Sequence, residues 1–415
     1  MNKTPKALRL HIGIFGRTNV GKSSFLNLAA GQDVAIISPL PGTTTDVVEK
    51  TMELLPVGPV VFLDTAGIDD RSLLAELRIK KSHKIFDRAD VILLIIEPDY
   101  WSEFEEEIIT EAEHRGLPCI IIINKTDLKT PGGEFLKKVK ERSPRVILTA
   151  SLGTARREMT LNELKKYLLE IVPDEFLNPP PLVGDLLKPG GIVVLVVPLD
   201  LEAPKGRLIL PQVQTIRDAL DNDAAALVVK EREYASVLAN LQNPPELVVC
   251  DSQVVLKMVA DTPSNIKCTT FSILFARQRS DLVEAARGVS TIKKLKAGDK
   301  VLIAEACSHH PVEDDIARVK IPRWLRQYIG GDLQIDVSAG NDFPENLREY
   351  KLVIHCGGCM INKRQMLSRI HQAQAQGVPV TNYGLSISFV QGVLERVLAP
   401  FPAALAAYRQ AAKNK

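Results

Sequence analysis

The stretch Gly16-Arg17-Thr18-Asn19-Val20-Gly21-Lys22-Ser23 decides the fold of the first part of the chain. It follows an apolar run at residues 10–15 and precedes a segment with helical periodicity, which is the setting of a Walker A sequence. Small residues let backbone N–H groups surround a phosphate, while Lys22 offers it a point charge and the Ser23 hydroxyl can bind Mg²⁺. We therefore expect a phosphate-binding loop within an α/β domain.

Strand-like apolar runs alternate with helical patterns along the whole chain, which predicts mostly parallel sheets with crossover helices. The expected strands are 10–15, 60–63, 91–96, 119–123, 146–149, 192–197, 225–229, 269–275, 300–304, 333–337, 352–355 and 378–381. Three consecutive prolines at 179–181 predict a linker, and a cluster of turn residues at 261–265 predicts a second boundary. We expect a P-loop domain at 1–176 and two further α/β domains at 182–262 and 266–415.

Two tetrapeptides indicate which nucleotide binds. Asp64-Thr65-Ala66-Gly67 ends the second run, where the Asp64 carboxylate can reach Mg²⁺ through water and the Gly67 N–H can sense a γ-phosphate. Asn124-Lys125-Thr126-Asp127 follows the fourth run. Asp127 can accept hydrogen bonds from the N1–H and 2-amino groups of guanine, a donor pair that adenine lacks. GTP is therefore the expected nucleotide.

Two further motifs complete the predicted nucleotide site. Residues 41–46 form a turn-rich stretch where a switch loop belongs, and we expect Thr44 to complete the Mg²⁺ shell, with an ordinary Thr-rich turn as the alternative. Thr149-Ala150-Ser151 would place the Ala150 N–H near the guanine oxygen. Lys22, Thr44 and Gly67 are the expected catalytic residues. The expected nucleotide-binding set is Asn19, Gly21, Lys22, Ser23, Ser24, Thr44, Asp64, Gly67, Asn124, Lys125, Asp127 and Ala150.

These motifs resemble the translation-factor class of P-loop GTPases, and within it the branch of the tRNA-modification GTPase TrmE and the ribosome-assembly GTPase Era. Gly42-Thr43-Thr44 and Asn19 are similar to the potassium-activated members, which implies that Asn19 helps to hold K⁺ near the transferred phosphoryl group. A loop-stabilising role is the alternative for Asn19. Ile68 stands where Ras-like proteins carry a water-orienting Gln. We therefore expect slow GTP hydrolysis that K⁺ stimulates and that serves regulation.

A cysteine constellation follows two strands of the last domain. Cys307 comes shortly after the run 300–304, and His355-Cys356-Gly357-Gly358-Cys359 closes the run 352–355. Because the carboxyl ends of parallel strands share one edge of a sheet, the three thiols can converge there. Three thiolates suit a 4Fe-4S cluster with one open iron, whereas zinc would take His309 or His355 as a fourth ligand. For the Cys-x-x-Cys pair alone, a redox pair or chance is a further alternative. Cys119, Cys250 and Cys268 lie in strand-like runs and are expected to pack.

The GTPase motifs, a middle α/β domain and this cysteine spacing together resemble the HydF family, the maturation GTPases of FeFe hydrogenase. The resemblance implies a scaffold that holds a 4Fe-4S cluster on Cys307, Cys356 and Cys359, with His309 and His355 as further candidate ligands. It implies that 182–262 dimerises, that higher homo-oligomers form, and that 266–415 binds the cluster. It also implies that a di-iron precursor, made with the radical-SAM maturases HydE and HydG, is received here and delivered to the apo-hydrogenase HydA.

Composition excludes several other classes. With 45% hydrophobic and 25% charged residues in 415, the chain is neither disordered nor fibrous. Lys and Arg total 52 against 50 for Asp and Glu, and no long basic run occurs, so neither nucleic acid nor membrane is an expected partner. No secretory signal is visible, and the cytoplasm is the expected compartment. The alternative is a TrmE- or Era-like GTPase of tRNA modification or ribosome assembly with a zinc-binding accessory domain.

Overall fold

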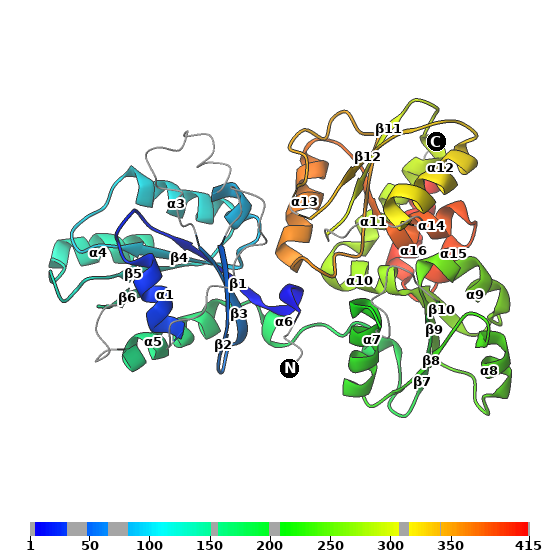
Figure 1. Ribbon diagram of the computed structural model, residues 1–415, viewed down its shortest axis with the longest axis horizontal. Coiled ribbons are helices and arrows are strands. Elements are labelled where there is room, and N and C mark those ends of the chain that lie inside the picture. Colours follow the sequence, from blue (N-terminus) through cyan, green and yellow to red (C-terminus); the bar gives the residue numbers. More distant parts are fainter. Residues whose placement is uncertain are drawn as a thin grey trace. The chain divides into compact units, whose positions relative to one another are not determined.

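A computed structural model describes residues 5–30, 48–64, 82–150, 157–198, 208–306, 315–340 and 342–413. The chain divides into two compact units, Met1–Pro179 and Pro180–Lys415 (Figure 1). The boundary between them in the sequence falls within the proline run at 179–181. In the part of the chain that the structure describes, no helix combines the length and hydrophobicity needed to cross a membrane. The finer division of the second unit at 262–266 stays a prediction.

The first unit is built on a six-stranded sheet with the order β2-β3-β1-β4-β5-β6. Its strands are β1 (Leu10–Phe15), β2 (Val48–Leu54), β3 (Gly58–Asp64), β4 (Val91–Ile96), β5 (Cys119–Ile123) and β6 (Val146–Leu148). Only the pairing of β2 with β3 is antiparallel among these. The register sets Ile14 of β1 beside Asp64 of β3, so the phosphate loop and the aspartate leave the same edge of the sheet. The predicted mostly parallel α/β fold is confirmed.

Helices cover both faces of this sheet, and for that reason its central strands are apolar throughout rather than alternating. The described helices of the unit are α1 (Lys22–Ala30), α3 (Glu103–His114), α4 (Gly133–Arg142), α5 (Arg157–Ile171) and α6 (Asp174–Leu177). Helices α1 and α5 lie on one face of the sheet, and α3 and α4 lie on the other (Figure 1). Their buried side chains belong to two separate apolar cores. The phosphate loop therefore lies between a buried strand and a helix that is fixed by packing.

The second unit contains two four-stranded parallel sheets, with the orders β10-β9-β7-β8 and β12-β11-β13-β14. The strands are β7 (Ile192–Val196), β8 (Ala225–Val229), β9 (Leu247–Cys250), β10 (Lys267–Thr270), β11 (Lys300–Ala304), β12 (Gln334–Ser338), β13 (Leu352–His355) and β14 (Val380–Asn382). One apolar core joins side chains from both sheets, and a smaller one covers the other face of the β11–β13 sheet. The two sheets of this unit are thus packed into one body.

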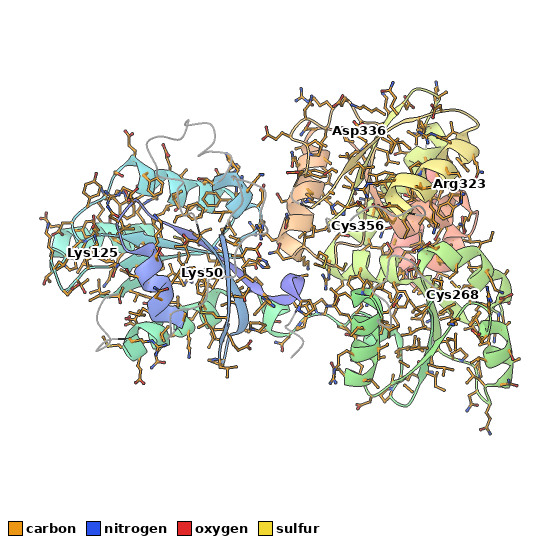
Figure 2. The ribbon with its side chains drawn as sticks, in the orientation of Figure 1. Lys50, Lys125, Cys268, Arg323, Asp336 and Cys356 are labelled. Atoms are coloured by element: carbon orange, nitrogen blue, oxygen red, sulfur yellow. The ribbon has the colours of Figure 1, made fainter. Side chains whose placement is uncertain are left out.

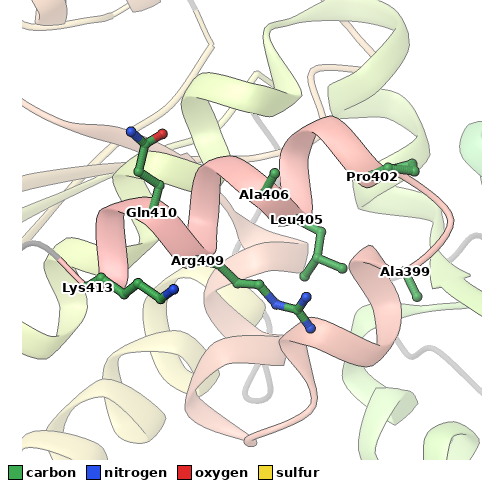
Figure 3. Close-up of a pocket in the computed structure, with 7 residues that line it drawn as sticks. All are labelled: Ala399, Pro402, Leu405, Ala406, Arg409, Gln410 and Lys413. Atoms are coloured by element: carbon green, nitrogen blue, oxygen red, sulfur yellow. The ribbon is translucent and has the colours of Figure 1, made fainter.

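The described helices of the second unit lie between and around these sheets. They are α7 (Leu210–Asp221), α8 (Tyr234–Asn240), α9 (Val255–Asp261), α10 (Phe271–Arg279), α11 (Leu282–Gly288), α12 (Ile321–Ile329), α13 (Lys363–Ala375), α14 (Tyr383–Val390), α15 (Leu394–Leu398) and α16 (Pro402–Lys413). A shallow groove beside α16 is lined by Ala399, Pro402, Leu405, Ala406, Arg409, Gln410 and Lys413 (Figure 3). This set holds no cysteine, histidine or carboxylate, so the groove offers no metal ligands.

One predicted strand is wrong. The run expected as a strand at 269–275 is strand only to Thr270, and α10 begins at Phe271. The Thr270 hydroxyl accepts a hydrogen bond from the Ile273 N–H at 3.2 Å, which is the contact of a helix N-cap. The helix is buried nearly all round, so its sequence lacks the polar face that distinguishes a helix from a strand. The strand that remains, β10, pairs with β9 and completes that sheet.

Candidate functional site

The phosphate loop has the backbone that its glycines predict. Gly16 and Gly21 have φ angles of +152° and +96°, and Asn19 is also left-handed at +65°. The Lys22 ammonium donates to the carbonyls of Gly16 at 2.5 Å and Arg17 at 2.9 Å, which holds the side chain along the loop. Because α1 begins at Lys22, the N–H groups of its first turn face the position that a phosphate would occupy.

Asn124 fastens the guanine-recognition sequence to this loop. Its side chain is buried, and its Nδ2 donates to the Val20 carbonyl at 2.9 Å. A Cβ placed on Gly21 would lie 2.2 Å from the same Nδ2. Gly21 is therefore required for this close approach as well as for its left-handed φ angle. The sequence predicts that Asn124 belongs to the site, but not that it contacts Gly21. Neither motif contains a local signal for that contact.

The loop that would read the base includes Lys125 (labelled in Figure 2) and makes hydrogen bonds to two other segments of the first unit. Lys125 adopts a φ of +59°, and its ammonium donates to a Glu97 carboxylate oxygen at 2.5 Å. The N–H and hydroxyl of Thr126 both donate to the Thr149 carbonyl, at 3.2 and 3.1 Å. Asp127 is exposed beyond them. The structure thus brings the sequences 124–127 and 149–150 together, as their predicted shared role requires.

Arg17 makes a second set of contacts that holds the phosphate loop in place, and the sequence did not predict it. The Arg17 guanidinium donates to Glu105 at 2.8 Å and lies 3.5 Å from the centre of the Tyr100 ring. Glu105 is fully buried at the start of α3, where its other oxygen accepts from the Ser102 N–H at 2.8 Å. The Arg17 carbonyl in turn accepts from Lys22. This chain of contacts ties the loop to α3.

The remaining predicted nucleotide residues divide into two groups. Asp64 is buried at the end of β3, while Ser23 is exposed and Ser24 half-buried at the start of α1. These positions lie on the sheet edge where a Mg²⁺-bound phosphate would sit. Thr44 and Gly67 lie outside the described residues, so their predicted contacts with Mg²⁺ and the γ-phosphate stay predictions.

The second candidate site is the cysteine loop, defined as residues 355–359. Strands β11 and β13 run side by side with Ala304 opposite His355. Beyond them the Cys356 N–H donates to the Ala304 carbonyl at 2.9 Å, and the Ala306 N–H donates to the Cys356 sulfur at 3.1 Å (Figure 2). The chain therefore touches Cys356 Sγ one residue before Cys307. Cys307 and His309 themselves lie outside the described residues.

Glycine shapes the cysteine loop, and Arg279 contacts it from α10. Gly358 has a φ of +66°, and a Cβ there would lie 2.3 Å from Met366 Cε. The Arg279 guanidinium donates to the carbonyls of Gly358 at 3.4 Å and Cys359 at 3.3 Å. Burial raises the pKa of the Cys359 thiol, and the nearby positive charge of Arg279 opposes that rise. Cys359 thus lies in an apolar environment with one positively charged side chain, that of Arg279, close by.

His355 is buried at the end of β13 with both ring nitrogens in contact. Nε2 lies 3.0 Å from an Arg369 nitrogen, and Nδ1 lies 3.0 Å from the Cys356 carbonyl. Because arginine has only donors, Nε2 must accept and the Nδ1–H must donate. Burial and the Arg369 charge lower the pKa of His355 to about 3, so the ring is neutral. For His355 to bind a metal as predicted, one of these two hydrogen bonds would have to break.

Among the described residues, no three His, Cys, Asp or Glu side chains are grouped as metal ligands. Cys356 and Cys359 supply two thiols, and the expected third belongs to Cys307. The other cysteines sit in strands: Cys250 and Cys268 are fully buried, and burial raises the pKa of Cys268 to about 11. Packing is the role that these positions support for Cys250 and Cys268.

Three family models match the chain. One described as the hydrogen maturase F dimerization domain matches residues 182–280, and one described as the hydrogen maturase F tetramerization domain matches 283–400. Together they cover more than half of the 415 residues. The chain belongs to the hydrogen maturase F family. A third model, described as a 50S ribosome-binding GTPase, matches residues 11–125.

The individual relatives of this hydrogen maturase F chain match its first unit. The tRNA modification GTPase MnmE of Synechococcus sp. (strain JA-2-3B'a(2-13)) is 44% identical over 156 residues, covering 37% of this chain and 33% of the relative. MnmE of Geobacillus thermodenitrificans (strain NG80-2) is 36% identical over 163 residues, covering 38% and 33%. The chain thus spans about a third of the length of the curated relatives it matches.

Solved structures with a similar chain course include Era of Aquifex aeolicus, at 22% identity and a TM-score of 0.32, covering 53% of this chain and 92% of Era. Another is the G domain of the T. maritima FeoB iron transporter, at 19% identity and a TM-score of 0.31, covering 40% and 99%.

The comparisons confirm the predicted HydF family and the P-loop GTPase domain, for which GTP and Mg²⁺ are the expected ligands. The two hydrogen maturase domains also confirm that the chain belongs to a homo-oligomeric family.

Proposed function

We propose that this chain is a GTP-regulated scaffold of FeFe-hydrogenase maturation, which holds a 4Fe-4S cluster on Cys307, Cys356 and Cys359. The observation that carries the proposal is the 3.1 Å hydrogen bond from the Ala306 N–H to the Cys356 sulfur. It supports the convergence of two separate chain segments on one centre. A metal held by two segments, rather than by a single Cys-x-x-Cys turn, is what a three-thiolate site needs.

The chemistry of the described donors fits an iron–sulfur cluster. An N–H donor to a cysteine sulfur and a nearby cation both stabilise the electron-rich sulfur of an iron–sulfur site. Zinc would call for a fourth protein ligand, for which His309 and His355 are the predicted candidates; His355 already uses both ring nitrogens, and His309 lies outside the described residues. When bound, a cluster with three cysteine ligands supplies one iron with an open coordination position.

The proposed cargo and partners are those that the resemblance to the family implies. In this proposal the chain receives a di-iron precursor made with HydE and HydG and delivers it to apo HydA. GTP binding orders the switch segments that carry Thr44 and Gly67, and hydrolysis ends that state. In the nucleotide site, Lys22 neutralises phosphate charge, Ser23 and Thr44 hold Mg²⁺, Asp64 reaches Mg²⁺ through water, and Gly67 senses the γ-phosphate.

Potassium stimulation is part of the proposal. Asn19 is exposed and left-handed at the tip of the phosphate loop, so its side chain is free to face a cation beside the phosphates. A monovalent cation there would offset charge that develops on the transferred phosphoryl group.

Anaerobic reconstitution tests the cluster and its purpose together. We expect brown protein with four iron and four sulfide per chain in wild type, whereas Cys356→Ser loses iron and no longer activates apo HydA. Cys119→Ala is the matched control, since Cys119 is a half-buried strand cysteine of the other unit. Colourless protein with stoichiometric zinc would instead favour the TrmE- or Era-like alternative.

A further inference from the structure

Arg279, the last residue of α10, carries a buried charge with an unusual set of partners. Its side chain is only 4% exposed. Besides the carbonyls of Gly358 and Cys359, its guanidinium donates to Gln214 Oε1 of α7 at 3.0 Å and lies 4.8 Å from the centre of the Phe275 ring. An arginine side chain stays protonated in proteins, so this buried group carries a positive charge. No carboxylate of the described residues contacts it.

Such burial is costly unless a negative charge compensates it. Two less deeply buried arginines of the chain have one. The Arg318 guanidinium donates to Glu305 at 2.9 Å and Asp315 at 3.0 Å, and Arg17 donates to Glu105 at 2.8 Å. At Arg279 the guanidinium instead contacts the carbonyls of Gly358 and Cys359 in the cysteine loop, and Cys359 is one of the predicted cluster ligands. The compensating anion is therefore expected at the cysteines.

We propose that Arg279, oriented by Gln214, is a positioning residue that offsets the negative charge of a cluster bound to the cysteine loop and raises its reduction potential. The inference rests on the proposed cluster site. A cluster held by thiolates gains a further negative charge when it is reduced, and a fixed cation beside a ligating cysteine lowers the free energy of that reduced form. Besides the Arg279 guanidinium, the Gln214 amide is a second hydrogen-bond donor in this region. Its Nε2 is buried and has no acceptor in the described part of the chain.

A purely structural role would leave the potential unchanged, so charge and shape must be varied separately. Arg279→Lys keeps the positive charge and loses the planar fork, whereas Arg279→Gln keeps a donor and loses the charge. Arg287→Gln is the matched control. Arg287 lies on the next helix, is exposed, and pairs with Glu284 at 2.9 Å. All variants are made in the full chain and reconstituted anaerobically.

The test is a redox titration of the cluster between dithionite and ferricyanide, followed by its electron paramagnetic resonance signal. We expect Arg279→Gln to lower the equilibrium constant for one-electron reduction about tenfold, which is about 59 mV more negative. Arg279→Lys and Arg287→Gln should stay close to wild type. We also expect iron to be lost to a chelator several-fold faster from Arg279→Gln.

An assembled cluster with an unchanged potential in Arg279→Gln overturns the inference. If Arg279→Gln does not fold, Gln214→Leu replaces it. That variant keeps the positive charge of Arg279 but removes the hydrogen bond that orients its guanidinium. An unchanged reduction potential in Gln214→Leu overturns the inference as well. A wild-type chain that assembles no cluster refutes the proposed function itself, which keeps the two failures distinct.

Discussion

At the scale of single residues, the nucleotide site depends on one close approach between two loops. Asn124 donates to the Val20 carbonyl across the space that any side chain on Gly21 would fill. Lys22, next to Gly21, is held by two carbonyls of the same loop. A change at Gly21 therefore moves the lysine and the guanine loop together, although neither is altered in sequence.

Gly21→Ala should weaken nucleotide binding. Its Cβ would lie 2.2 Å from Asn124 Nδ2, and the φ of +96° strains any L side chain. We expect GTP affinity to fall at least about tenfold, or about 1.4 kcal/mol, in a fluorescent-nucleotide titration. Gly133→Ala is the control, since nothing lies within 4 Å of its added Cβ. Wild-type affinity in Gly21→Ala would contradict the contact.

Asn19→Ala should remove the response to potassium. If Asn19 helps to hold a cation that offsets phosphoryl charge, wild-type hydrolysis should be about tenfold faster in potassium than in sodium, and the variant should hydrolyse GTP at the sodium rate in both. Phosphate release at equal ionic strength measures this. Asn27→Ala, an exposed asparagine on α1, is the control. Equal rates for wild type in the two salts would refute the potassium assignment.

At the scale of elements, the strands that sequence predicts well are those buried on both faces. The runs at Leu10–Phe15, Val91–Ile96 and Cys119–Ile123 agree with the structure because continuous hydrophobicity is the mark of a covered parallel strand. Strand β2 (Val48–Leu54) was missed, since an edge strand alternates polar and apolar residues and lacks such a run. Helix α10 was read as a strand because it is buried all round.

The residues of the candidate sites also differ in whether the sequence predicts them. Sequence predicts that Cys356 directly follows a strand and that Lys22 lies where the phosphate loop meets a helix, because strand, loop and motif are neighbours in the chain. It does not reveal Arg279 or Glu105, which reach the sites from helices about 80 residues away. Their roles depend on packing between elements, and a single sequence carries no local signal for that.

Asp315 shows how an element's stability should depend on pH. It begins the helical segment that continues into α12, accepts from the Ala317 and Arg318 N–H groups at 2.8 and 2.9 Å, and pairs with the Arg318 guanidinium. Burial alone would raise the pKa of Asp315, but the hydrogen bonds and the charge of Arg318 outweigh it and hold the pKa below 3.8. The stability from this carboxylate is therefore fully present above about pH 4 and is lost as the pH falls through the folded pKa.

Asp315→Asn should lower the free energy of unfolding by about 1–3 kcal/mol at pH 7, because it removes the charge and keeps the cap. The difference from wild type should shrink as the pH falls below 4. Fluorescence of Trp324 during urea unfolding, in a Trp101→Phe background, reports this unit alone, since the chain has two tryptophans. Asp281→Asn is the control, an exposed cap that accepts from the Glu284 N–H at 2.9 Å. A difference that is constant with pH would contradict the role of the charge.

At the scale of the whole molecule, each candidate site lies within one unit. The nucleotide site belongs to Met1–Pro179 and the cysteine loop to Pro180–Lys415. The start of the second unit is fixed to its own helix α10, because Arg277 donates to the Pro181 carbonyl at 2.9 Å and to Asp185 at 2.6 Å. The chain segment that joins the two units is therefore fixed to the second unit.

Nucleotide should stabilise the first unit alone. A non-hydrolysable GTP analogue at about one hundred times its dissociation constant adds about 2.7 kcal/mol to the unfolding free energy of whatever cooperative unit binds it. Each unit holds one tryptophan, so Trp324→Phe reports the first through Trp101 and Trp101→Phe reports the second through Trp324. At fixed protein concentration we expect the analogue to raise the urea midpoint only for Trp101. The matching ATP analogue should raise neither, because adenine lacks the donors that Asp127 accepts. An equal shift of both midpoints would show that the two units unfold as one cooperative unit and would contradict the prediction.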